Sequence, residues 1–153
     1  MSLIAAGGTT ETITITNASF FPDLQLQNFR EAMRIDGTVT DSRAVHALEA
    51  AMYEANQLLA KWMQEQQDAG VDTIEGTPQP TWQPAGYHKS LYLRAVWSLA
   101  KSNLVERYRD YDSTGAGHDR AEALEMTDDD YRRDAAWALS DIRGRARTTV
   151  ELI

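Results

Sequence analysis

The chain contains no cysteine. This absence excludes a disulfide framework, a thiolate metal site and a cysteine nucleophile. Long apolar runs are also missing: hydrophobic residues make up 42% of the 153 positions, but no stretch is long enough to cross a bilayer. Residues 1–8 lack the basic region and the apolar length of a signal peptide. We therefore expect one soluble domain with a substantial core, assembled in the cytoplasm and away from membranes.

Basic residues are scarce relative to acidic ones: 15 Lys and Arg stand against 23 Asp and Glu, and the net charge is −8. Free nucleic-acid binding needs a cationic footprint that neutralises phosphates, so this balance argues against it. Solubility alone explains the charge. An acidic wall would also let DNA slide past without sticking, which leaves DNA as a passing neighbour only.

Residue patterns that carry chemistry are lacking as well. The histidines His46, His88 and His118 share no spacing that would suit a metal site. The acidic run 128–130 lacks the alternation of a calcium loop and is explained by a helix N-terminus. The Gly-Ala-Gly of 115–117 has no following Gly-Lys-Ser/Thr, and no Gly-x-Ser-x-Gly occurs. We expect no catalytic residue, no metal, no cofactor and no enzyme activity.

Four segments show the three-to-four-residue periodicity of amphipathic helices. Pro22 opens the first, which is expected from Asp23 to Ile35 with Gly37 at its end. Thr40 caps the second, and Gly70 ends it. The third is expected at 87–111, and the fourth runs from the cap Thr127 to Gly144. The expected inner faces are Leu26, Phe29, Met33; Leu48, Ala51, Met52, Ala55, Leu58, Leu59, Trp62, Met63; Tyr92, Val96, Leu99; and Tyr131, Ala135, Ala138, Leu139, Ile142. The pattern predicts a mainly α fold, a four-helix bundle.

The segments outside these helices are extended. Residues 12–16 alternate with period two and predict a strand, for which three outcomes stay open. It pairs with the strand-like 148–153, it adds to a neighbouring subunit, or it is a frayed terminus. The division expected is an arm at 1–19, a bundle at 20–144 and a tail at 145–153.

A proline-rich stretch interrupts the bundle at residues 71–86. Three of the four prolines of the chain lie there, so an extended loop is predicted. Trp82 lies in its middle. Two interpretations of this side chain remain open: an exposed contact residue, or a ring that folds back on the core.

The densest polar cluster is Glu106-Arg107-Tyr108-Arg109-Asp110-Tyr111-Asp112, near the end of the third helix. On a helix, residues four apart pair, which would make this a solvated helix end. Arginine and tyrosine are also favoured at protein interfaces, so an interface is the second interpretation.

Four short stretches, in order, carry a resemblance to a known family. They are Phe20-Phe21-Pro22-Asp23, Met33-Arg34-Ile35 with Thr38-Val39, Glu106-Arg107-Tyr108-Arg109, and the end from Trp137 through Ile142-Arg143-Gly144 to Ile153. Together they resemble the head completion (head–tail joining) proteins of temperate contractile-tailed phages, the GPL family. The resemblance runs from about Phe20 to Ile153 and is interrupted at the proline-rich loop.

The resemblance implies a connector-type bundle that docks on the portal protein as a ring of about twelve copies after DNA packaging. In that role it would help retain the genome and receive neck or tail-completion proteins, at the head–tail junction of the virion. The candidate subunit interface is Glu106, Arg107, Tyr108, Asp110 and Trp137. The candidate portal-binding tail is Arg145, Arg147, Val150, Leu152 and Ile153. The alternative function is a monomeric helical adaptor or regulator that binds one protein partner through the Trp82 loop.

Overall fold

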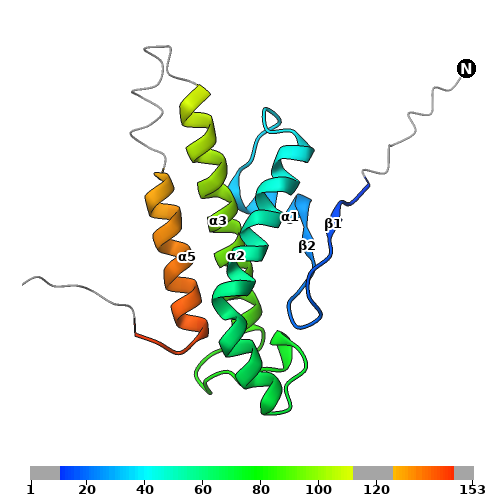
Figure 1. The fold of residues 1–153 in the computed structure, drawn as a ribbon, viewed down its shortest axis with the longest axis vertical. Helices are drawn as coiled ribbons and strands as arrows, with labels where there is room; N and C mark the ends of the chain where they lie inside the picture. Colours follow the sequence, from blue (N-terminus) through cyan, green and yellow to red (C-terminus); the bar gives the residue numbers. More distant parts are fainter. Residues whose placement is uncertain (1–10, 112–125, 147–153) are drawn as a thin grey trace, which may run out of the picture.

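The computed structural model describes residues 11–111 and 126–146 (Figure 1). Two long antiparallel helices form the centre, a third helix lies along one of them, and a small hairpin with a short helix covers the other side. In chain order the elements are β1 (Thr14–Ile15), β2 (Leu24–Gln25), α1 (Leu26–Met33), α2 (Asp41–Asp68), the 3-10 turn η1 (Ile74–Gly76), α3 (Tyr87–Tyr111) and α5 (Asp128–Ile142). The predicted mainly α fold is confirmed.

Helix α2 begins and ends where its sequence signals predict. The Thr40 hydroxyl accepts the backbone N–H of Arg43 at 3.3 Å, and Gly70 follows the helix with a left-handed φ of 87°. Its buried stripe is Ala44, Ala47, Leu48, Ala51, Met52, Ala55, Leu59 and Trp62. The prediction was wrong for Leu58, which is 46% exposed. Leu58 stands about 100° around the helix from the fully buried Leu59, at the edge of the stripe.

Helices α3 and α5 form the largest packing contact of the described residues. Tyr92, Val96 and Leu99 of α3 are buried, as predicted. A capping box starts α5: the Thr127 hydroxyl accepts the N–H of Asp130 at 3.3 Å, and the Asp130 carboxylate accepts the N–H of Thr127 at 3.0 Å. These bonds to Thr127 hold the pKa of the Asp130 carboxyl below its ordinary value.

The first helix does not begin at Asp23, after Pro22, as the sequence predicted. It begins at Leu26, because Leu24–Gln25 forms β2 and pairs antiparallel with β1. The turn that joins the strands uses Asp23, whose carboxylate accepts the backbone N–H of Asn17 at 2.9 Å. A side-chain bond of this kind offers the backbone a turn in place of a helix.

Strand β1 finds its partner within this hairpin. The register pairs Thr14 with Gln25 and Ile15 with Leu24. The sequence did not name this partner; of the outcomes it left open, the frayed terminus is wrong for Thr14 and Ile15, residues 148–153 lie outside the described residues, and addition to a neighbouring subunit stays a prediction. A two-residue strand is too short to show period-two alternation, so β2 left no signal in the sequence.

Helix α1 also ends before Gly37, where the sequence placed its end. Arg34 adopts a left-handed φ of 54°, and the backbone turns so that Ile35 enters the core. Arg30 holds this turn to the start of α2, because its guanidinium reaches the Asp41 carboxylate at 2.7 Å. The core position of Ile35 and this ion pair therefore decide where the helix stops.

The segment 71–86 is a loop, as its prolines predict, apart from the single turn η1. Ile74 in that turn is buried, and its N–H donates to the carbonyl of Phe20 at 2.8 Å. The loop is thereby attached to the hairpin. Trp82 is 74% exposed, so its ring does not fold back on the core.

A polar network centred on the buried Tyr92 joins the hairpin to both long helices. The Asn17 amide donates to the Tyr92 hydroxyl at 2.8 Å, and that hydroxyl donates to the Asn56 carbonyl oxygen at 2.6 Å. The Asn56 amide donates back to Asn17 at 2.9 Å. Phe21 stacks on the Tyr92 ring with centroids 4.7 Å apart. One fully buried side chain thus ties together three parts of the chain that are distant in sequence.

The first testable prediction removes the centre of this network. Replacing Tyr92 by Phe removes two partly buried hydrogen bonds, to Asn17 and Asn56, each worth about 0.5–1.5 kcal/mol, so the free energy of unfolding falls by about 1–3 kcal/mol. Urea unfolding measures it. Tyr53→Phe is the matched control, because that ring is 64% exposed, and it should change nothing. Equal stability of the two variants would contradict the role of the network.

A second prediction concerns pH. Burial raises the pKa of Tyr92 to about 12, above its ordinary value near 10, so the folded state holds the phenol proton more tightly than the unfolded state does. The stabilisation is complete below pH 10 and is lost as the pH rises from 10 to 12. The free energy of unfolding should therefore fall more steeply over this range in the wild-type protein than in Tyr92→Phe. Parallel curves for the two proteins would contradict it.

Candidate assembly surfaces

The residues predicted as an interface lie on two adjacent helices. Glu106 and Arg107 are exposed near the end of α3, and Trp137 lies half-buried on α5. The side chains of Tyr108 and Asp110 lie outside the described residues. Of the predicted tail, Arg145 is exposed just past α5, whereas Arg147, Val150, Leu152 and Ile153 lie outside the described residues.

Glu106 makes an ion pair within the subunit. Its carboxylate lies 3.2 Å from the guanidinium of Arg132 on α5, which also donates to Asn103 at 3.4 Å. Both charged side chains are about half exposed, so the pair contributes no more than about 1 kcal/mol. Glu106 therefore connects α3 to α5 within the subunit, and its place in an interface stays a prediction.

Trp137 lies off the buried stripe of α5, as the sequence predicted. The guanidinium of Arg133 lies 5.1 Å from the centroid of its ring, a cation–π contact. The same arginine is 3.0 Å from the Asp130 carboxylate. Together these three side chains form one partly exposed row along α5.

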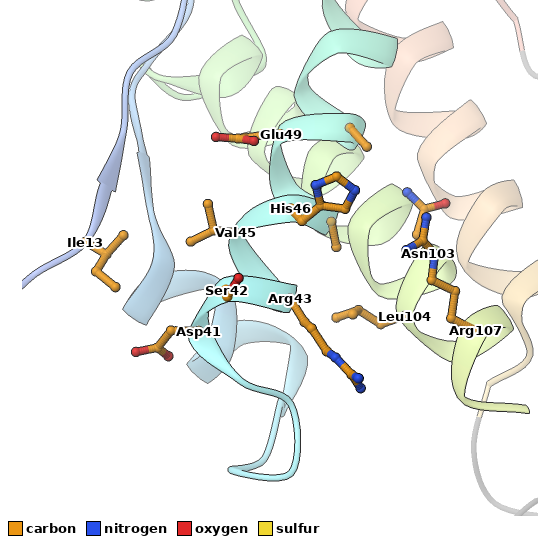
Figure 2. Close-up of a pocket in the computed structure, with 12 residues that line it drawn as sticks. Ile13, Asp41, Ser42, Arg43, Val45, His46, Glu49, Asn103, Leu104 and Arg107 are labelled. Atoms are coloured by element: carbon orange, nitrogen blue, oxygen red, sulfur yellow. The ribbon is translucent and has the colours of Figure 1, made fainter. Parts of the chain in front are cut away.

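A groove of about 690 Å³ opens between the first half of α2 and the last turns of α3 (Figure 2). Figure 2 shows two sides: Arg43 and His46 lie toward α3 with Asn103 and Arg107, whereas Asp41 and Glu49 lie toward the hairpin. The lining residues are Ile13, Asp41, Ser42, Arg43, Val45, His46, Ala47, Glu49, Ala50, Asn103, Leu104 and Arg107. Sequence analysis identified only Arg107 of this set, because the groove exists only once α2 and α3 are packed.

A second hollow, of about 600 Å³, lies at the opposite end of the bundle, between the proline-rich loop and the end of α5. Trp82, Thr77, His88 and Arg145 are among its lining residues. Thr77 is only 4% exposed, and its hydroxyl has no hydrogen-bond partner among the described residues. Burial lowers the pKa of His88, whose ring lies 5.6 Å from that of Trp62.

Metal-ligating residue types do not cluster in the part of the chain that the structure describes. Across residues 11–111 and 126–146, no three His, Asp or Glu side chains come together as a metal site would require. His46 is exposed on α2 and His88 is buried on α3, whereas His118 lies outside the described residues. In the same ranges, no helix is long and apolar enough to cross a membrane.

The sequence that forms this helical body matches the model of a known family. The family model of the phage head completion protein (GPL) covers residues 15–153. The chain belongs to this family of phage head completion proteins.

Among curated proteins, the chain is similar to the head completion/stabilization protein of Escherichia phage P2. The two are 32% identical over 139 residues, which is 91% of this chain and 82% of that protein. No solved structure matches significantly. The resemblance drawn from four short stretches is thereby confirmed.

The family match begins earlier in the chain than those stretches did. It starts at residue 15, within β1, and the structure buries Ile15 against the core. From the sequence alone the resemblance begins at about Phe20, because the alternating threonines of residues 12–16 form no distinctive pattern. Residues 14–15 belong to the folded body because they form the hairpin with β2, and this pairing could not be recognised in the sequence.

A third prediction tests the orphan hydroxyl of the second hollow. A buried hydroxyl without a partner costs roughly 1–3 kcal/mol, and valine has nearly the same shape as threonine. Thr77→Val should therefore leave the free energy of unfolding unchanged or raise it by up to about 1 kcal/mol in urea unfolding. Thr127→Val, which removes a hydroxyl that caps α5, should lower it by about 1 kcal/mol. A clear loss for Thr77→Val would show that its hydroxyl is bonded.

Proposed function

We propose that this protein completes the phage head by docking as a ring on the portal protein after DNA packaging, where it helps to retain the genome. Membership of the head completion family over residues 15–153 is the observation that carries the proposal. On this view the protein is a structural part with no enzymatic activity, located at the neck of the virion after assembly in the host cytoplasm. Its other partners would be neck or tail-completion proteins.

Charge supports a place beside the channel. With a net charge of −8, the chain repels DNA, so a ring of it lets the genome pass without binding it. Portal docking is assigned to the tail, in which Arg145 and Arg147 precede the apolar residues Val150, Leu152 and Ile153. An apolar end favours burial in a partner over exposure to water. The ring contact is assigned to the side of the bundle formed by α3 and α5. Arg107, Tyr108 and Asp110 lie near the end of α3, and Trp137 lies on α5.

One observation favours the alternative function, a monomeric adaptor or regulator that binds one partner through its proline-rich loop. Trp82 is 74% exposed beside the second hollow, and aromatic anchors of this kind carry binding energy at many interfaces. This alternative differs from the ring in two ways. It predicts one partner molecule per chain, and it predicts that binding depends on the proline-rich loop.

The experiment that separates the two mixes the protein with portal rings of its own phage and measures co-sedimentation. The connector proposal expects saturation near one copy per portal subunit, unchanged by Trp82→Ala. No binding between two folded partners would contradict it. Binding that is lost with Trp82→Ala would favour the adaptor.

A fourth prediction concerns the tail in the same assay. A variant that lacks residues 145–153 should bind portal rings at least about tenfold more weakly, because the tail supplies the proposed portal contact. Its helical circular dichroism should match that of the full chain, since α5 ends at Ile142. Normal docking by this variant would contradict the role of the tail.

A further inference from the structure

We propose that the groove between α2 and α3 receives the acidic outer face of α5 from the next copy of this chain. The inference rests on the ring of the proposed function and identifies the two surfaces that meet within it. The groove is the acceptor surface, and the outer face of α5 is the donor surface.

One side of the acceptor surface carries two arginines, in a chain that is acidic as a whole. Arg43 and His46 on α2 and Arg107 on α3 all lie on the side of the groove that faces α3 (Figure 2). Arg107 is exposed, and its guanidinium makes no ion pair within the described residues. The two arginines on this side favour a negatively charged occupant.

The floor of the groove suits a helix. Ala47 and Ala50 of α2 and Leu104 of α3 line it with small or apolar side chains. Small residues on a helix surface let a second helix approach closely and pack its ridges between theirs. The acids of the groove, Asp41 and Glu49, lie on the hairpin side, and Arg30 already pairs with Asp41 at 2.7 Å.

The donor surface is the face of α5 that points away from its own core. Steps of 100° per residue put Asp129, Arg133 and Ala136 opposite the buried Ala135 and Ala138, and all three are exposed. The positive charge of Arg133 is already balanced by Asp130, at 3.0 Å. The exposed start of α5 therefore presents the carboxylate of Asp129 and remains net negative.

Both surfaces lie at the same end of the bundle. Figure 1 shows the start of α2, the end of α3 and the start of α5 together at the upper end. Copies that stand side by side with parallel axes therefore bring the donor surface of one to the height of the acceptor surface of the next. Because the donor and acceptor surfaces are different parts of the chain, the contact is head-to-tail, the kind that closes into a ring.

The test exchanges the charges of Arg107 and Asp129 and measures how many copies sediment with portal rings. Alone, Arg107→Glu and Asp129→Lys should each reduce the bound copies about tenfold or more, since like charges then meet at every contact. An equimolar mixture of the two should recover wild-type binding, because alternating copies place opposite charges at each contact. The double variant in one chain should also bind, but should not mix with the wild type.

Arg94→Glu is the matched control. It makes the same charge change on α3, also at an exposed arginine, thirteen residues from Arg107 and so about 20 Å along the helix. This variant should bind as the wild type does. Circular dichroism of every variant should match the wild type, because both exchanged side chains are exposed.

Each remaining outcome overturns one part of the account. Single variants that saturate portal rings like the wild type, or a mixture that does not recover, would overturn the groove contact while the ring itself stands. Loss of even the first bound copy with Arg107→Glu would make the groove a portal-binding surface and overturn the contact between copies. If wild-type protein fails to dock, the proposed function falls and the ring contact falls with it.

Discussion

The partly buried hydrogen bonds among Asn17, Tyr92 and Asn56 are the constraint on which the rest of the structure depends. Each hydrogen bond contributes about 0.5–1.5 kcal/mol, and the three bonds form a closed network in which each member holds the other two in one position. The hairpin, α2 and α3 each contribute one member. Their relative register is therefore set at this point, and the Phe21 ring stacks on Tyr92.

Helix α3 carries that register to the other end of the bundle. Three turns beyond Tyr92, the hydroxyl of Ser102 donates to the carbonyl of Asp128 at 3.1 Å, and Glu106 pairs with Arg132. The hairpin and α5 are thus both attached to one helix. This makes the groove beside Arg107 a preformed surface, and binding to a preformed surface loses less conformational entropy. The second hollow lies at the opposite end, which suits a protein proposed to meet one kind of partner at its side and another through its tail.

Local signals in the sequence predicted most of the helical body. The helix ends were predicted correctly at Thr40, Thr127 and Gly70. Helix capping involves only residues three or four positions apart, so tertiary packing does not change it. The hairpin was not predicted because an aspartate such as Asp23 is common both at helix starts and in turns. In the folded chain its carboxylate accepts the backbone N–H of Asn17, which stabilises the turn. The groove and the network escaped because they join residues tens of positions apart. Arg107 was identified by residue type, but its neighbours His46 and Ala50 follow only from packing.

The absence of cysteine allows the central claim, a head-to-tail ring on the portal, to be tested directly. A chain with Arg107→Cys and Asp129→Cys carries only those two thiols, which form a disulfide only when their Cα atoms come within about 7 Å. Oxidation on portal rings should produce a ladder of covalent multimers on non-reducing gels, and neither single variant should extend beyond a dimer. A portal-bound double variant that stays monomeric, or stops at a dimer, would contradict the account.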